Sequence, residues 1–368
     1  MHLPPYCACL HCSVVCLRDT LDPQEFGKTC REAIDHFAEG VAAEGKVVKG
    51  AQATAVIITA KNAAATCAQA VASALAQRPV SEVVFVDDGS ADDTAAVAAS
   101  ADDGSGRLRL IRLDRNVGPA RGRNVAIDAS SAPNLCILDA DDFMGAGRLD
   151  GLYEKGGDGW DLLADDMLFA SRPSAGAVFD KLLPADFKVP SDLTLSAFAL
   201  GNLPRKNRYR RELGFLKPVI RRSFLRAHGL RYDERLRLGE DLLLYAGCLI
   251  EGAVFRVVDA CGYYAIERRD SLSVEHATAD VAALHRALVE FEADALIRGR
   301  SVGALPEYTR STRNNLALRR ALDAKRAGGW LAFLTACGEA PSSFAYIVSE
   351  LARANMARLA SQRQRAAS

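Results

Sequence analysis

The sequence lacks three features that would assign it to a familiar class of protein. No apolar run approaches the roughly 20 residues that a membrane-spanning helix needs. Neither sign of charge is in excess, because 46 Lys and Arg residues balance 46 Asp and Glu residues. A strongly basic chain would suggest nucleic acid as a partner, and we expect none here. No internal repeat is visible either. The 368 residues, 49% of them hydrophobic, predict a globular protein with a sizeable core.

The start of the chain lacks the marks of a secretion signal. The first seventeen residues are fairly apolar, but they contain neither a basic segment nor a small-residue cleavage site. Five later cysteines stand singly among apolar neighbours, as small core residues do. We therefore expect a reducing, cytoplasmic compartment.

The remaining cysteines gather within the first 30 residues. They are Cys7, Cys9, Cys12, Cys16 and Cys30, with His11 among them. A zinc site is an alternative here, although the spacing does not provide two CxxC pairs. The simpler interpretation is that residues 1–50 form an irregular extension.

From residue 53 onward, short apolar segments alternate with helix-forming segments. We expect strands at TAVIITAKN (54–62), VSEVVFVDDGS (80–90), RLRLIRL (107–113) and LCILDADDF (135–143), with helices between them. This alternation predicts an α/β fold with a doubly wound sheet. We expect one domain over residues 51–275, divided near residue 150, and a helical region over 276–368.

Acidic residues follow the second and fourth strands: Asp87 and Asp88 after one, Asp139 and Asp141 after the other. Ligands bind open parallel sheets outside the carboxyl ends of the strands, so these side chains should meet at one rim. Two carboxylates separated by one residue suit Mg²⁺ or Mn²⁺, since these ions prefer oxygen ligands and share their shell with substrate phosphates. Taken alone, a D-x-D pair is also consistent with a solvated acidic turn.

A basic helix lies between the two acidic strands. Gly118, Arg121, Arg123 and Asn124 provide positive charge and hydrogen-bond donors there. An arginine at this place could bind a phosphate in a bidentate manner, or it could pair with one of the acids.

Four segments in this order and spacing resemble the nucleotide-sugar half of family 2 glycosyltransferases: VIITAKN, VVFVDDGSADDT, NVGPARGRN and CILDADDF. The resemblance covers roughly residues 53–270 and implies a GT-A fold, a mixed sheet that binds a UDP-sugar. The residues implied to bind the nucleotide sugar are Asn62, Asp87, Asp88, Arg123, Asn124 and Asp139. The residues implied to hold Mg²⁺ or Mn²⁺ are Asp139, Asp141 and His276. One departure is that Thr59 and Lys61 replace the proline and aromatic residue often found in the first motif.

The pair Glu240-Asp241 matches an acidic pair that this family carries at the start of a helix. The resemblance implies that Asp241 is the general base of an inverting transfer and that Glu240 supports the acceptor. Ordinary acidic residues at a helix N-terminus are the alternative interpretation.

The second half is similar to glucosyltransferases that build succinoglycan-type exopolysaccharide. That similarity implies transfer of glucose to a lipid-linked oligosaccharide at the inner face of the cytoplasmic membrane. A basic cluster would then contact the membrane surface through Arg205, Lys206, Arg208, Arg210 and Arg211. A solvated loop explains the cluster equally well. A homologue that binds nucleotide sugar without turnover, or one that serves another surface glycan, remains an alternative function.

Overall fold

The structure is a computed structural model that describes residues 52–170, 180–204, 212–266 and 276–367. The N-terminal extension with its cysteines, and the basic cluster at residues 205–211, lie outside the described residues. All contacts and distances are those of the described residues.

The first half is built from four parallel strands and the helices that connect them. In chain order these are β1 (Thr54–Ala60), α3 (Cys67–Leu75), β2 (Val80–Asp87), α4 (Thr94–Ser100), β3 (Leu108–Arg112), α5 (Pro119–Ala129) and β4 (Asn134–Asp139). The strands lie in the order β3-β2-β1-β4 and are parallel throughout. Helices cover both faces of β1, which explains why this strand is almost wholly buried and reads as the nearly unbroken apolar segment TAVIITA, whereas β3 at the edge of the sheet is only partly buried.

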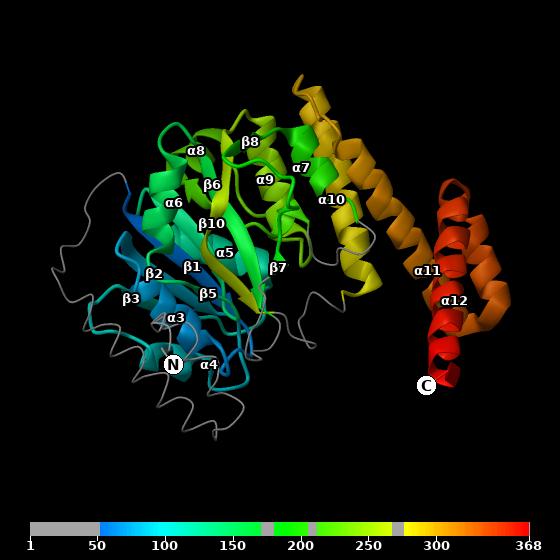
Figure 1. Cartoon of the computed structure of the whole chain (residues 1–368), viewed down its shortest axis with the longest axis horizontal. Coiled ribbons are helices and arrows are strands. Elements are labelled where there is room, and N and C mark those ends of the chain that lie inside the picture. The colour runs from blue at the N-terminus through cyan, green and yellow to red at the C-terminus, as the bar shows by residue number, and fades with distance from the viewer. Residues whose placement is uncertain (1–51, 171–179, 205–211, 267–275, 368) are drawn as a thin grey trace, which may run out of the picture.

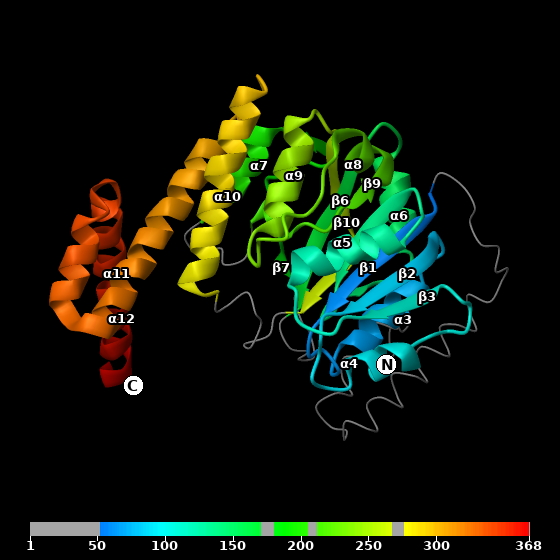
Figure 2. The same cartoon turned by 180° about the vertical axis from the view of Figure 1, so that it is seen from behind.

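The direction of the connections reverses between β1 and β4. The chain moves outward from β1 to β3 and then returns across β1 to β4. Right-handed crossovers therefore place α3 and α4 on one face and α5 on the other, as Figures 1 and 2 show from opposite sides. A crevice outside the carboxyl ends of β1 and β4 is the usual ligand site of such sheets.

The second half extends the same sheet and makes it mixed. Its elements are β5 (Phe143–Met144), α6 (Arg148–Gly156), β6 (Leu162–Ala170), β7 (Asp180–Lys181), β8 (Ser191–Leu193), α7 (Leu195–Gly201), β9 (Val219–Arg221), α8 (Arg222–His228), α9 (Glu240–Ile250) and β10 (Phe255–Ile266). β9 is inserted between β4 and β6 and runs antiparallel to both. β6 and β10 pair in parallel, and β5, β7 and β8 lie at their margins.

Three helices follow the sheet: α10 (Thr278–Ile297), α11 (Leu305–Gly338) and α12 (Phe344–Ala367). The first two pack beside the second half of the sheet, whereas the end of α11 and all of α12 project away from it (Figures 1 and 2). The expectation of a mixed α/β sheet of GT-A type followed by C-terminal helices is confirmed.

Candidate active site

Two aspartates at the end of β2, Asp87 and Asp88, organise the loop that follows the strand. Asp88 accepts backbone hydrogen bonds from Val117 N at 2.6 Å and Gly118 N at 2.9 Å. Asp87 accepts one from Ser90 N at 3.0 Å. Asp88 thereby holds the entry to α5 against the end of β2, a structural task that the motif alone did not reveal.

One oxygen of Asp87 is left for another partner. Asp87 is fully buried, and its Oδ2 makes no hydrogen bond within the described residues, although Arg112 Nε lies 3.5 Å away. A buried acceptor without a hydrogen bond is costly, so a donor group from a bound ligand would stabilise it.

The loops after β1, β2 and β3 are locked together at this rim. Asn62 lies at φ 51°, and its side-chain Oδ1 accepts a hydrogen bond from Ala91 N at 2.9 Å. Its backbone N–H donates to Ser90 Oγ at 2.9 Å. Gly89, at φ 65°, has no room for a side chain, because a Cβ there would lie 2.7 Å from the carbonyl carbon of Arg115. The predicted nucleoside end of the site is therefore a preformed backbone surface.

Five charged side chains meet at the carboxyl end of β4, and we call them the ionic cluster. Arg123 Nη2 lies 3.0 Å from Asp139 Oδ1, and Arg123 Nη1 lies 2.6 Å from Glu240 Oε1 and 3.3 Å from Asp241 Oδ1. Lys217 Nζ lies 3.0 Å from Asp139 Oδ2 and 2.8 Å from Asp241 Oδ2. Two cations thus bridge the predicted donor carboxylate and the predicted base.

The five members reach the ionic cluster from four separate parts of the chain. Arg123 lies on the inner face of α5, and Asp139 ends β4. Glu240 and Asp241 form the first turn of α9, behind Gly239 at φ 75°. Lys217 precedes β9, and because β9 is antiparallel to β4, its start lies at the carboxyl end of β4.

The close packing of opposite charges perturbs the ionisation of these groups. Burial alone would raise the pKa of Asp139, but Lys217 and Arg123 lower it to about 2. Burial opposes the charge on Lys217, yet Asp139 and Asp241 hold its pKa above the usual value. Asp139 therefore stays ionised at neutral pH and keeps its attraction for cations.

The third acidic residue of this segment, Asp142, has a different environment. It accepts from Tyr263 Oη at 2.8 Å and from Ile266 N at 3.0 Å, while Asp139 N donates to Tyr263 Oη at 3.3 Å. Burial, together with the charges of Asp141 and Asp139, raises its pKa well above the ordinary value. Asp142 joins the end of β4 to β10 and is not exposed to ligand.

The predicted metal ligands are only partly assembled. Within the described ranges, no three His, Cys, Asp or Glu side chains group as metal ligands. His276 lies just before α10, where its carbonyl accepts from Arg319 Nη1 at 2.6 Å. Asp139 keeps 31% of its side chain exposed, and Asp141 is half-buried nearby in sequence. Such a pair fits Mg²⁺, which proteins commonly hold with one or two carboxylates plus substrate phosphates.

Lys217 is the residue of the ionic cluster that sequence reasoning missed. It is buried, and its backbone carbonyl accepts from Arg148 Nη2 at 3.0 Å. Arg148 is itself fixed by a fully buried ion pair with Asp165 at 2.7 Å. The available signal was a single lysine between apolar residues in GFLKPVI, which is unusual for a strand that enters a core.

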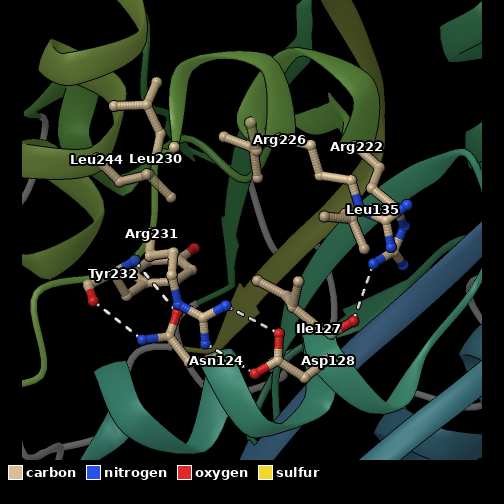
Figure 3. Close-up of a pocket in the computed structure, with 12 residues that line it drawn as sticks. Asn124, Ile127, Asp128, Leu135, Arg222, Arg226, Leu230, Arg231, Tyr232 and Leu244 are labelled. Carbon is tan, nitrogen blue, oxygen red and sulfur yellow. Dashed lines mark hydrogen bonds and ion pairs between the residues drawn. The ribbon is translucent and has the colours of Figure 1, made fainter.

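Asn124 lies one residue beyond Arg123 but faces a separate cavity of about 260 Å³ (Figure 3). Its amide donates to Tyr232 O at 3.0 Å, and its carbonyl accepts from Tyr232 N at 3.2 Å. An ion pair at 2.8 Å between Arg231 and Asp128 closes another side of this cavity. Asn124 thus braces the segment that leads to α9, and its predicted contact with the donor stays a prediction.

Comparisons with known proteins show the family of this chain. Residues 55–171 match the family described as Glycosyl transferase family 2. Succinoglycan biosynthesis protein ExoU of Rhizobium meliloti (strain 1021) is 45% identical over 278 residues, which cover 75% of this chain and 80% of that protein. ExoO of the same organism is 36% identical over 246 residues, covering 65% and 69%. A crystal structure of S. aureus TarS 1-349 in complex with UDP-GlcNAc has a TM-score of 0.49 at 18% identity, covering 78% of this chain and 80% of TarS.

Proposed function

The chain belongs to glycosyl transferase family 2, and we propose that it transfers glucose from UDP-glucose to a hydroxyl of a growing, lipid-linked oligosaccharide of a succinoglycan-type exopolysaccharide. Both Rhizobium relatives are named as succinoglycan biosynthesis proteins, which supports this choice of polysaccharide. We place the reaction in the cytoplasm at the inner face of the membrane, where the expected lipid-linked acceptor would be available.

The donor would lie along the rim between β2 and β4. Asp87 Oδ2, buried and without a hydrogen bond in the described part of the chain, would accept from the base or ribose. Asp139 and Asp141 would hold a Mg²⁺ or Mn²⁺ ion, with His276 as a further candidate ligand. When bound, this ion would neutralise charge on the diphosphate leaving group.

The acceptor hydroxyl would lie beside Asp241. In a single in-line displacement, its oxygen attacks the anomeric carbon while the bond to the diphosphate oxygen breaks and UDP leaves. Asp241 takes the hydroxyl proton, so the configuration inverts and no covalent enzyme intermediate is needed. Glu240, fixed by Arg123 at 2.6 Å, would orient the acceptor.

One observation carries this proposal. Arg123 and Lys217 each contact both Asp139 and Asp241, so the predicted donor carboxylate and the predicted base have a fixed separation before any substrate binds. Such preorganisation is what a displacement between two bound substrates requires.

The test is release of UDP by purified protein from UDP-glucose, UDP-galactose and UDP-N-acetylglucosamine, with Mg²⁺, Mn²⁺ or EDTA. We expect slow, metal-dependent hydrolysis of UDP-glucose that is lost in Asp139→Ala. Asp150→Asn, which removes a carboxylate paired with Arg78 outside the ionic cluster, is the matched control and should behave as wild type.

Asp241→Asn separates catalysis from binding. We expect UDP binding by calorimetry to be retained and transfer to be lost, because the amide cannot accept the proton. Unchanged transfer would remove Asp241 from the mechanism, and no UDP binding by wild-type protein with metal would refute the donor assignment. Binding without turnover, even with an acceptor, would favour the non-catalytic alternative.

A further inference from the structure

The C-terminal hairpin, which we define as residues 330–367, folds back beyond a break in α11. Gly329, at φ 74°, breaks α11, and the segment after it turns back through Pro341–Ser343 into α12. Phe333, Cys337 and Ile347 of the hairpin form an apolar cluster with Ala317 and Ala321 of α11, and this cluster is separate from the main core. Figures 1 and 2 show the hairpin projecting from the body of the protein.

The outer surface of this hairpin is unusually apolar. Ten large apolar side chains are exposed among the described residues, and six of them belong to the hairpin: Trp330, Leu331, Leu334, Phe344, Val348 and Met356. They are not needed for its own core, because Phe333 and Ile347 already face inward. An exposed apolar surface of this extent is typical of a docking site.

Positive charge accompanies these apolar residues. The whole chain is neutral, yet residues 323–368 contain six basic residues and three acidic ones, and two of the basic residues form ion pairs, Arg326 with Asp323 and Arg353 with Glu350. The basic residues are Lys325, Arg326, Arg353, Arg358, Arg363 and Arg365. Lys325 Nζ lies 3.7 Å from the centre of the Trp330 ring. Tryptophan, leucine and phenylalanine beside Lys and Arg are the composition of helices that lie in the interface of a bilayer.

We propose that the C-terminal hairpin docks on an anionic lipid bilayer. Trp330, Leu331 and Leu334 would enter the boundary between headgroups and acyl chains, and the net positive charge of this end of the chain would attract it to anionic headgroups. Two copies of the hairpin would instead bring like charges together, which disfavours self-association through this face. None of the helices in the described ranges is by itself long and apolar enough to span a membrane, whereas Leu305–Gly338 and Pro341–Met356 reach that length and composition only as a pair bent by 97°. The proposal is docking at the bilayer surface.

This surface differs from the predicted basic cluster at residues 205–211, and docking does not depend on the identity of the donor or acceptor. The two helix segments carry the apolar side chains on exposed faces, so binding needs no unfolding of the hairpin. The proposal therefore concerns the location of the enzyme, and it can fail while the transferase activity stands.

The test is co-sedimentation of the full-length protein with vesicles of phosphatidylcholine alone or with about one third phosphatidylglycerol. We expect the wild-type protein to bind the anionic vesicles. The triple variant Trp330→Gln/Leu331→Gln/Leu334→Gln should bind them at least about tenfold more weakly. The matched control is Leu296→Gln/Ile297→Gln, which replaces exposed apolar side chains on α10 and should bind as wild type. Both variants should keep the donor hydrolysis of the wild type.

Tryptophan fluorescence provides a second readout. The chain has two tryptophans, and Trp160 is 3% exposed whereas Trp330 is 63% exposed. A blue shift on adding anionic vesicles would therefore report entry of Trp330 into the bilayer. Wild-type protein that does not sediment with anionic vesicles would overturn the proposal, as would equal losses in both variants. A wild-type dimer in light scattering that the triple variant dissociates would assign the surface to a second copy instead.

Discussion

Replacing Lys217 with methionine tests whether the ionic cluster is held by its buried cations. Methionine has nearly the length of lysine but no charge, so it removes the contacts at 2.8 Å to Asp241 and 3.0 Å to Asp139 without leaving a large void. Lys217 is only 5% exposed, and water therefore cannot replace it easily. The two carboxylates would retain Arg123 as their shared cation.

The expected loss of stability can be bounded in two ways. Removing one partner of a buried ion pair costs about 3–5 kcal/mol. The depression of the Asp139 pKa to about 2, which Lys217 and Arg123 produce together, corresponds to about 2–3 kcal/mol at about 1.4 kcal/mol per unit. Since Arg123 remains, we expect the free energy of unfolding of Lys217→Met to fall by about 3 kcal/mol.

Urea denaturation followed by circular dichroism at neutral pH measures this loss. Arg231→Met is the control, because Arg231 pairs with Asp128 at 2.8 Å with 52% of its side chain exposed, and such surface pairs contribute about 0–1 kcal/mol. A loss in Lys217→Met no larger than that of the control would refute the inference that Lys217 holds the cluster together.

Three further substitutions test other parts of the structure. Burial raises the pKa of Asp166 to about 6, so its stabilising contribution is present below about pH 4 and is lost as pH rises through 6. Asp166→Asn can keep the hydrogen bond from Leu183 N and should remove this pH-dependent loss of stability. Its free energy of unfolding should exceed that of the wild type by up to about 3 kcal/mol at pH 7.5, as measured by urea titrations at several pH values. Gly89→Ala should weaken UDP binding by calorimetry, because its Cβ would collide with Arg115; unchanged affinity would show that the rim is adaptable. Arg148→Met should lower the unfolding free energy by about 3–5 kcal/mol, since it leaves a buried aspartate unpaired, and a loss under 1 kcal/mol would contradict that.

The sequence was informative wherever a local pattern decides the structure. The strands at residues 54–60, 80–87, 108–112 and 134–139 lie within or within one residue of the predicted segments. Buried parallel strands contain continuous apolar runs, and the edge strand at 108–112 mixes apolar and basic residues instead. The convergence of Asp87 and Asp139 at one rim was also predictable, because it follows from the parallel order of the strands.

Long-range pairing was the part that local patterns could not supply. Nothing in GFLKPVI indicates that β9 inserts antiparallel beside β4, and that insertion alone brings Lys217 to Asp139. The same holds for Tyr263, which reaches Asp142 from a strand 121 positions away in sequence. The motif implies that Asp88 binds the ligand, which stays a prediction; the structure adds that each of its oxygens accepts a backbone hydrogen bond from the next loop.

These contacts change what the D-x-D segment needs from a metal. The acids at the end of β4 are expected to bind a divalent ion, and Arg123 and Lys217 already provide two positive charges there. The ionic cluster contains two cations and the three carboxylates Asp139, Glu240 and Asp241, so its formal net charge is −1. Including Asp141 makes the formal charge −2. The chain's own cations therefore suffice to hold the carboxylates in place before substrate arrives. The remaining negative charge matches the proposed divalent ion, whose role would then be to bring the diphosphate to a site that the chain has already ordered.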